Sequence, residues 1–585
     1  MRTRKLLSLI AAAALLMAVL ASLPAAVPVL AVDAISTPED LLGMSMTGNY
    51  VLTNNIELTE ELVKPLGQFK GTLDGQGFGI YGVEVFGRQW YTGLFNAILP
   101  GAVVENLIVV TGENGVRCET DRVGMLCGEL GGTVRNCAFY GLVFGEKGCV
   151  GGITSMPTAT TGGSNPLIEN CYIEAKIIAY SSYVGGVVGV DFANYGGPGT
   201  MTIRNTVSNC EIISQANTYP CVGGIFSAAV NGHPEATNKP LKIKIENCRV
   251  GGSITTKGGY TGGIVSRNAG DWVTIDRCAF TGVIINESGA TGGIAGLFDK
   301  GANITDCYSN GWIYGPTAGG IVGQQDGEDT NARPVNCWSG SKVFIKPEVL
   351  PVDPEDPEAE PQTKSVGGLF IGDYKNGGEL PGCYVVPSAS YITNPLGNNA
   401  KEVEMTVVAE AGKTKAASYP AFDFEDIWTT KGDTKPPYLQ WEDEWVMPGL
   451  PENHPADRPA TQWPTDPPTP TPTETPTETP TETPSQGPTD TPTETFTIPP
   501  SPVDTPTPSA TTPPVTVKPT ATPKIEPGDA NCDGEVNITD ILFVRDVIFG
   551  TETLSPPGYR NLRLAVGADV TIEEILLIRD VIFGD

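Results

Sequence analysis

The residues best suited to chemistry lie near the C-terminus, in an acidic loop at residues 529–540. Oxygen-bearing side chains stand at loop positions 1, 3, 5, 9 and 12, and Gly534 stands at position 6, where a calcium loop turns sharply. A hard cation requires several oxygens that converge from one short segment. We therefore expect calcium to be bound by the side chains of Asp529, Asn531, Asp533 and Asp540, by the backbone carbonyl of Glu535, and by Asn537 directly or through water.

The apolar helical segment after this loop, 541–550, recurs 34 residues later at 575–584. The loop before the second copy departs from the calcium pattern, because a cation and small residues replace most of the ligands. With Glu574 aligned on Asp540, loop positions 1, 3, 5, 7 and 9 hold Arg563, Ala565, Gly567, Asp569 and Thr571. The sequence therefore predicts one bound calcium and a second copy that is held together by apolar packing.

This repeated loop–helix unit at 527–585, preceded by a Pro/Thr-rich segment, resembles a dockerin, the module that docks onto the cohesins of a cellulosome-type scaffold. The resemblance implies a small α-helical module with a cohesin as its partner. It also implies that loop positions 10 and 11 and the following helix contact the cohesin. In this chain those residues are Ile538, Thr539, Arg545 and Asp546, with Ile572, Glu573, Arg579 and Asp580 in the second copy. Because Glu573 places a charge opposite Thr539, the two copies need not be interchangeable in binding.

The larger part of the chain is a series of repeats. The pattern V-G-G-[IL], or a close variant, begins at residues 123, 150, 184, 222, 261, 291, 318 and 366. A second pattern, an apolar residue followed two positions later by Asn, Asp or Arg and then by Cys, ends at Cys137, Cys171, Cys248, Cys278 and Cys307. In four units the cysteine precedes the second glycine by the same 15 residues. This constant spacing indicates a repeated structural unit.

Each unit holds short runs of β-branched residues between Gly, Asn and Ser turns, without helical periodicity. One unit cannot bury its own apolar face, whereas stacked units can. We therefore predict a mainly β fold, a right-handed parallel β-helix over residues 32–448, in which glycine provides turns with positive φ and close approach of neighbouring backbones. A β-propeller is disfavoured, because each unit has too few strong strands for a four-stranded blade.

Residues 47–56 (TGNYVLTNNI) and 71–80 (GTLDGQGFGI), together with the V-G-G-[IL] series, resemble the GLUG-motif repeat proteins, whose repeats are parallel β-helical. The segment 422–441 resembles the way such arrays end. The resemblance implies a fold and a secreted or surface protein, and it implies no particular chemistry.

The chain has 13 cysteines, and those of the repeats are expected to form a buried ladder rather than disulfides. Equivalent residues of a parallel solenoid stack about 4.8 Å apart and point the same way, which suits apolar packing better than a disulfide dihedral. Cys118 and Cys127 are the one pair worth testing as a disulfide. A zinc site is disfavoured, because the chain has no C-x-x-C and its two histidines, His233 and His454, are far apart in sequence.

Two segments of different composition flank the repeats and the last module. Residues 1–31 read as a signal peptide, with a basic start, an apolar core and a small-residue cleavage site, so we expect an extracellular protein with no membrane span after cleavage. Residues 449–526 are predicted to be a disordered tether, because the 77 residues from 451 to 527 contain 23 Pro and 22 Thr.

The net charge of −30 argues against a nucleic acid or anionic lipid as partner, since both require a cationic surface. Dockerins usually deliver enzymes that degrade plant polysaccharide, so one hypothesis is a glycoside hydrolase or polysaccharide lyase. We assign no catalytic residue, because the repeats contain no adjacent Asp-Asp and no Gly-His-Gly. His233 is interpreted as a loop residue, Asp74 as part of a turn, and the acidic insertion 353–360 as a solvated loop.

The competing hypothesis is a β-helix that binds polysaccharide without cleaving it, or a purely adhesive or structural module displayed on the scaffold or cell surface. Exposed aromatic side chains on the loops would then grip the glycan. The candidates are Trp90, Tyr91, Tyr183, Tyr260, Trp272, Trp312 and Tyr314. In either case we expect the protein to act in polysaccharide catabolism as a scaffold-docked component.

Overall fold

The structure is a computed structural model that describes residues 32–449, apart from 88–90, 120–121, 159–163, 181, 193–198, 217–219, 231–240, 269–272, 299–302, 326–332, 347–365, 375–377, 388–391 and 400–401. The chain divides into two units, 1–475 and 476–585, and the described residues all belong to the first. The signal segment 1–31, the tether and the C-terminal module lie outside the described residues. Within the described part, no helix has the length and apolar character needed to cross a membrane.

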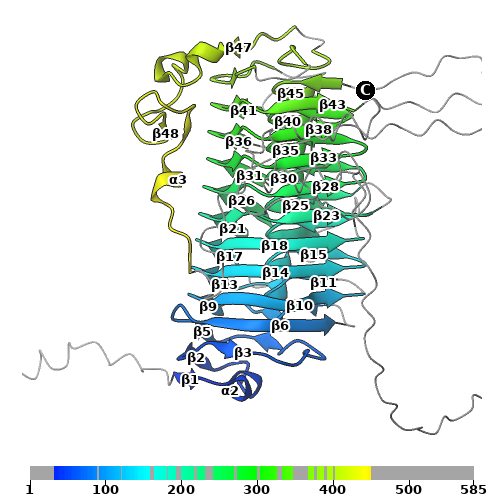
Figure 1. Ribbon diagram of the computed structural model, residues 1–585, viewed down its shortest axis with the longest axis vertical. Coiled ribbons are helices and arrows are strands. Elements are labelled where there is room, and N and C mark those ends of the chain that lie inside the picture. The colour runs from blue at the N-terminus through cyan, green and yellow to red at the C-terminus, as the bar shows by residue number, and fades with distance from the viewer. Residues whose placement is uncertain are drawn as a thin grey trace, which may run out of the picture. The chain divides into compact units, whose positions relative to one another are not determined.

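The repeats form a parallel β-helix, as predicted, and Figure 1 shows its coils stacked into a column. Each coil passes through four faces in the same order, which we name sheets A, B, D and C. Strands β13, β14, β15 and β16 make up one such coil. Sheet A contains β1 (Asp33–Ile35), β2 (Asn49–Leu52), β5 (Thr72–Asp74), β9 (Val103–Glu105), β13 (Thr133–Arg135), β17 (Leu167–Glu169), β21 (Thr200–Arg204), β26 (Lys242–Glu246), β31 (Val273–Asp276), β36 (Asn303–Thr305) and β41 (Pro334–Val335).

Sheet B contains the longest strands, several of which are split in two. It comprises β3 (Ile56–Glu57), β6 (Gly79–Gly87), β10 (Ile108–Cys118), β14 (Ala138–Gly145), β18 (Tyr172–Ala179), β22 (Val207–Ser208), β23 (Glu211–Ser214), β27 (Arg249–Val250), β28 (Ser253–Thr256), β32 (Ala279–Phe280), β33 (Val283–Asn286), β37 (Tyr308–Ser309), β38 (Trp312–Gly315), β42 (Trp338–Ser339), β43 (Lys342–Ile345), β46 (Tyr384–Val385) and β47 (Thr406–Val407).

Sheets D and C complete each coil. Sheet D comprises β7 (Tyr91–Thr92), β11 (Arg122–Val123), β15 (Cys149–Gly151), β19 (Tyr183–Gly185), β24 (Cys221–Gly223), β29 (Tyr260–Gly262), β34 (Ala290–Gly292), β39 (Thr317–Gly319) and β44 (Val366–Gly368). Sheet C comprises β4 (Gln68–Phe69), β8 (Phe95–Ile98), β12 (Cys127–Leu130), β16 (Thr154–Pro157), β20 (Val188–Phe192), β25 (Phe226–Val230), β30 (Val265–Asn268), β35 (Ala295–Phe298), β40 (Val322–Gln325) and β45 (Ile371–Tyr374). A short helix, α2 (Pro38–Leu42), precedes the first coils and begins with a capping box between Thr37 and Asp40.

The V-G-G pattern marks the corner between sheets D and C. Its valine points into the core, as Val184 and Val222 do, and both are fully buried. The second glycine faces the carbonyl of the next coil, so that a Cβ added at Gly186 would lie 2.0 Å from the oxygen of Gly224. None of these second glycines is among the residues with positive φ in the described chain. The prediction of close backbone approach is therefore confirmed, and the prediction of positive φ is wrong at this corner.

Glycine does provide turns with positive φ elsewhere, as Gly148, Gly259 and Gly289 do between sheets B and D. Positive φ also recurs at the turn between sheets A and B, which we call the turn ridge. One residue of each coil has φ near 50° there, namely Gln76, Asn106, Asn136, Asn170, Asn205, Asn247, Arg277, Asp306 and Asn336. Asparagine tolerates this conformation better than most residues do. Its amides also bond from coil to coil, with Nδ2 of Asn136 donating to Oδ1 of Asn106 at 3.1 Å and Nδ2 of Asn170 donating to Oδ1 of Asn136 at 2.9 Å.

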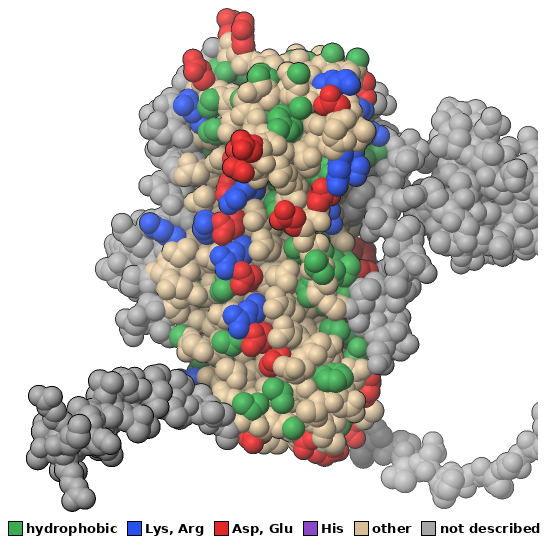
Figure 2. Space-filling model, turned by 90° about the vertical axis from the view of Figure 1, so that its left-hand side faces the viewer, with side chains coloured by type: hydrophobic (Ala, Val, Ile, Leu, Met, Phe, Trp, Pro, Cys, Tyr) green, Lys and Arg blue, Asp and Glu red, His purple; other side chains and the backbone are tan. Residues whose placement is uncertain are grey.

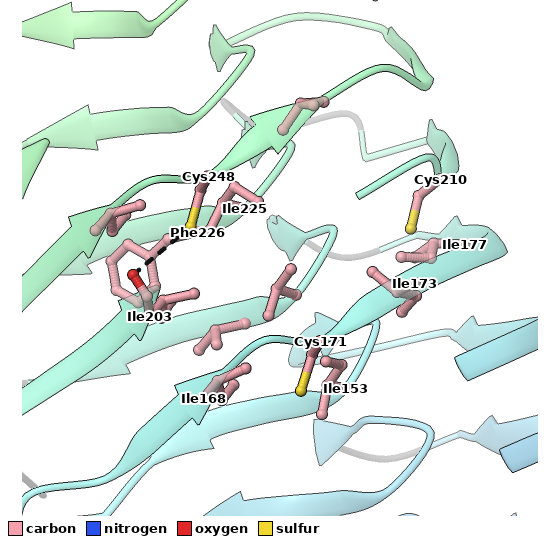
Figure 3. Packing of buried hydrophobic residues seen from close by; sticks show 14 of the residues in the cluster. Ile153, Ile168, Cys171, Ile173, Ile177, Ile203, Cys210, Ile225, Phe226 and Cys248 are labelled. Carbon is pink, nitrogen blue, oxygen red and sulfur yellow. Dashed lines mark hydrogen bonds between the residues drawn. The ribbon is translucent and has the colours of Figure 1, made fainter. Parts of the chain in front are cut away.

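The cysteine ladder follows the turn ridge directly, and all 12 cysteines in the described residues are free and buried. Figure 3 shows Cys171 and Cys248 pointing into the core among isoleucines, and Cys248 Sγ lies 3.6 Å from the carbonyl oxygen of Ile203. The predicted ladder is confirmed, and Cys337 and Cys383 extend it. In the one coil that lies between those of Cys171 and Cys248, Thr206 occupies the position of the ladder cysteine. Cys118 and Cys127 are also buried in the core, and no disulfide joins them.

Charged residues of sheet A form pairs across neighbouring coils on the outside of the column. Arg135 bonds Glu105 and Arg204 bonds Glu169, each at 2.6 Å. Figure 2 shows acidic and basic side chains alternating along the height of this side. Such partly exposed pairs contribute little each, on the order of 0–1 kcal/mol. In these pairs, part of the negative charge of the repeats is balanced by neighbouring arginines on the surface.

Candidate functional site

The last part of the described chain doubles back along the outside of the column. After β47 pairs with β46, residues 408–449 run past sheet B toward the earlier coils, and we call this segment the strap. It contains two 3-10 turns, Glu410–Gly412 and Ala416–Ser418, the hairpin of β48 (Trp428–Thr429) and β49 (Tyr438–Leu439), and the short helix α3 (Trp441–Glu444). Figure 1 shows the strap, in yellow, beside the strands of the column.

Three tryptophans of the strap form hydrogen bonds with three levels of the turn ridge. The indole Nε1 of Trp428 donates to Oδ1 of Asp306 at 3.4 Å, and that of Trp441 donates to the carbonyl of Arg277 at 3.1 Å. Further down the column, Trp445 Nε1 donates to the carbonyl of Asn205 at 2.8 Å. The strap is thus fixed to the ridge by groups that combine an apolar body with one polar atom.

Aromatic side chains fill the space between the strap and sheet B. Outward-facing Tyr308 and Trp338 stack with ring centroids 5.5 Å apart. On the strap side, the rings of Phe422 and Trp428 stack at 4.3 Å, and Trp428 lies 6.2 Å from Tyr308. This cluster is separate from the core inside the coils. It explains why the aromatic run 422–441 is part of the fold rather than of the tether.

One acidic side chain of the strap is buried against the column. Glu442 accepts hydrogen bonds from the hydroxyl of Tyr308 at 3.0 Å and from the backbone N–H of Leu439 at 3.1 Å, and its carboxylate lies 3.4 Å from Nη1 of Arg249. Desolvation raises the pKa of Glu442, against the opposing attraction of Arg249. Asp306 is buried beneath Trp428, and desolvation raises its pKa to about 6.

A groove of about 600 Å³ lies between the strap and the outer face of sheet B. Its floor comes from β38, β42 and β43 and the turns beside them, and its wall comes from the strap. The lining residues are Asn310, Gly311, Trp312, Trp338, Gly340, Lys342, Val386, Pro387, Glu410, Lys413 and Pro436. The ammonium of Lys342 lies 4.2 Å from the centre of the Trp312 ring, which fixes both side chains.

The lining combines aromatic, amide, ammonium and carboxylate groups, the kinds of group that orient a polar ligand against an apolar surface. Glycoside hydrolysis normally requires two carboxylates on either side of the bond. In the described lining Glu410 is the single carboxylate, and it forms an ion pair with Lys413. Three other described hollows, of about 530, 530 and 440 Å³, are each lined by at most one carboxylate. None of these four hollows, as the described residues line them, brings two carboxylates together.

The predicted aromatic residues lie on strands, so their placement on loops is wrong for the five that the structure describes. Trp312 and Tyr314 belong to β38, and Trp312, 8% exposed, contributes to the groove. Tyr91, Tyr183 and Tyr260 begin β7, β19 and β29 on sheet D. Two of these tyrosines stack against guanidinium groups, Tyr91 with Arg122 and Tyr260 with Arg267. Trp90 and Trp272 lie outside the described residues.

Asp74 ends β5 and accepts a hydrogen bond from Nδ2 of Asn106 at 2.9 Å, so it serves the turn ridge as a structural residue. His233 and the insertion 353–360 lie outside the described residues. The same holds for the calcium loop and for every residue proposed to contact a cohesin. Within the described residues, no cluster of three or more metal-ligating side chains is present.

Sequence reasoning missed the strap as a wall of the groove, and with it Glu410, Lys413 and Pro436. It also missed Asn310 and Lys342 on the floor. The aromatic run 422–441 was the one available signal, since such a density of large apolar residues is unusual in a tether.

No protein-family model matches the chain, and no curated protein matches it. Three chains among the solved structures match it, and one of them is titled "Crystal structure of a putative immunoglobulin A1 protease from Bacteroides ovatus". The similarity has 16% identity and a TM-score of 0.30, and it covers 70% of this chain and 92% of that chain. At this TM-score the similarity carries no argument about this protein.

Proposed function

We propose that this protein is a secreted component of a cellulosome-type assembly, whose β-helix binds a plant polysaccharide in the groove between sheet B and the strap. The dockerin-like module at 527–585 would attach it to a cohesin in a calcium-dependent way, and the GLUG-like repeats would display the groove. The observation that carries the proposal is the groove lining, which Trp312, Asn310 and Lys413 share with a single carboxylate, Glu410, that is paired with Lys413.

We favour binding over cleavage because the groove contains groups that can contact the hydroxyls and the apolar face of a sugar. Amide and ammonium groups donate hydrogen bonds to hydroxyls, and an aromatic ring packs against the apolar face of a pyranose ring. The rigid parallel strands beneath the floor hold these groups in place without rearrangement, which lowers the entropic cost of binding.

The test is retention of the full-length protein on immobilised pectin, xylan and glucan, with assays for reducing ends and unsaturated product. We expect retention on one glycan without product. The double variant Asn310→Ala with Lys413→Ala should bind about tenfold more weakly, because two hydrogen-bonding groups are lost. Lys176→Ala is the matched control, since it removes an exposed lysine from β18 on the same sheet, outside the groove. Formation of cleavage product would show that the protein is an enzyme. A protein that is retained on none of the three glycans would instead have a structural role.

The docking part of the proposal is tested separately, with a panel of cohesins in calcium and in chelator. We expect binding to one class of cohesin that is lost on chelation. Binding that persists in chelator, or a chain that binds no cohesin, would count against this assignment.

A further inference from the structure

Two buried carboxylates lie where the strap meets the column, one on each side of the interface. Glu442 belongs to α3 of the strap, and Asp306 belongs to the turn ridge beneath Trp428. We propose that the strap is an acid-tightened latch, held more firmly against the column in mildly acidic solution than in neutral solution through Glu442 and Asp306. The latch is independent of what the groove binds.

Glu442 meets three elements of the protein. The side chain is 7% exposed and faces Arg249 of β27, Tyr308 of β37 and the backbone N–H of Leu439, and Tyr438 acts on Tyr308. Arg249 is itself partly exposed, so its attraction is weakened by solvent. The removal of water around Glu442 outweighs this attraction, which is why docking favours the protonated carboxyl.

Asp306 is 7% exposed and faces a mixed set of groups. Trp428 Nε1 and the amide of Asn336 donate to it and lower its pKa, whereas the negative charge of Asp276 and the thiol of Cys337 act in the opposite direction. Desolvation is the largest influence and raises the pKa to about 6 from an ordinary value of 3.8. Trp428 covers this carboxyl, so docking of the strap is part of that desolvation.

The sign of the pH effect follows from linkage. When the strap detaches, both carboxyls return to water and to their ordinary pKa values, so the docked state binds more protons than the detached state. Docking is therefore strengthened as pH falls through about 6, and the advantage is lost as pH rises above that value.

The latch also bears on the groove, because Glu410, Lys413 and Pro436 of its wall come from the strap. Pro436 precedes β49, which leads directly into α3 and Glu442. A strap that detaches at α3 and Trp428 would thus move one wall of the groove away from Trp312 and Lys342.

Hydrogen exchange of the full-length protein, corrected for the intrinsic rate at each pH, tests the latch. We expect amides of 428–447 to be protected at least about fivefold more strongly at about pH 5 than at about pH 7.5, while amides of the inner coils do not change in this way. Glu442→Gln and Asp306→Asn mimic the protonated forms. Each should raise protection at neutral pH and reduce its pH dependence, and the double variant should remove most of that dependence.

Glu444→Gln is the matched control, because this exposed residue on the same helix does not face the column. It should leave the pH dependence intact. Equal protection of the strap at both pH values in the wild type would overturn the proposal. So would a double variant that folds, as judged by the exchange of the inner coils, yet keeps the full pH dependence.

Discussion

The indole nitrogen of Trp445 donates a 2.8 Å hydrogen bond to the backbone carbonyl of Asn205, which lies 240 residues earlier in the chain. The Trp445 ring also lies 6.3 Å from the ring of Tyr172. Together with the hydrogen bond from the Tyr140 hydroxyl to the carbonyl of Gly449, this contact holds the far end of the strap against the column.

Replacement of Trp445 with phenylalanine should keep most of the packing and remove the donor. The carbonyl of Asn205 would be left without this partner, and we expect a loss of about 1 kcal/mol in the free energy of unfolding. Denaturant unfolding of the full chain measures it. Val446→Ala, at a residue that is 74% exposed, is the control and should change stability very little. An equal loss in both variants would contradict the assigned role of the indole.

Arg277 interrupts the amide ladder of the turn ridge. Oδ1 of Asn247 is buried and has no hydrogen-bond partner among the described residues, while Nη2 of Arg277 bonds Asp276 at 2.8 Å instead. Arg277→Asn should supply the missing donor at a position with φ of 49°, which asparagine tolerates, and raise stability by about 1 kcal/mol.

The matched control for this prediction is Arg204→Asn, which removes a comparable ion pair with Glu169 from a strand rather than from the ridge. It should be neutral or slightly destabilising. If thermal or denaturant unfolding shows that both variants lose stability equally, the ladder interpretation is wrong.

Gly224 is the second glycine of a V-G-G corner, and a Cβ added there would lie 2.1 Å from the carbonyl oxygen of Gly263. The next coil, which carries Gly263, is held in place by the same hydrogen bonds between coils, so it cannot move away to relieve the clash. We expect Gly224→Ala to destabilise the protein by about 3 kcal/mol in denaturant unfolding. In Gly258→Ala the nearest atom would lie 3.2 Å from the new Cβ, so this control should cost far less.

The buried thiols should be silent toward reagents in the native protein. All 12 described cysteines are buried, which keeps reagents away from them. Desolvation also raises the pKa of Cys127 to about 12 and that of Cys210 to about 11, whereas hydrogen bonds from neighbouring groups outweigh desolvation and lower the pKa of Cys278 and Cys337, so these two are protected by burial alone. Because the thiolate is the reactive form, a thiol-specific dye should label at most Cys532 before unfolding and all 13 cysteines afterwards. Rapid labelling of several thiols in native protein would show that the core ladder is open, whereas fewer than 13 labelled cysteines after unfolding would show that disulfides had formed.

Calcium binding by the full-length chain should show one high-affinity site in calorimetric titration. Asp533→Ala should abolish it, because a carboxylate ligand is removed from the loop at 529–540. Asp569→Ala is the control in the second copy, where most of the expected ligands are already missing, and it should leave binding unchanged. Two high-affinity sites would refute the assignment of a single calcium.

The β-helix was predictable from the chain because its determinants repeat. In a parallel stack each coil packs on a copy of itself, so the same position requires the same kind of residue, which explains the serial glycines and cysteines. The prediction was incomplete where single coils depart from the repeated pattern. Thr206 replaces a cysteine and Pro381-Gly382-Cys383 replaces the usual asparagine turn, so the ladder appeared shorter in the sequence than it is in the structure.

The sequence by itself determined the repeated coil and the burial of its cysteines, and it predicts the calcium loop, whose ligands would all lie within one short segment. Tertiary structure alone decided the strap and the groove. Glu442 and Tyr308 are 134 residues apart, and the groove joins Trp312 of β38 to Lys413 of the strap. Such contacts depend on where a non-repeating segment docks on a periodic surface. Every coil offers a similar ridge, so the position is set by the combined fit of aromatic rings, buried carboxylates and indole donors, which no local pattern encodes.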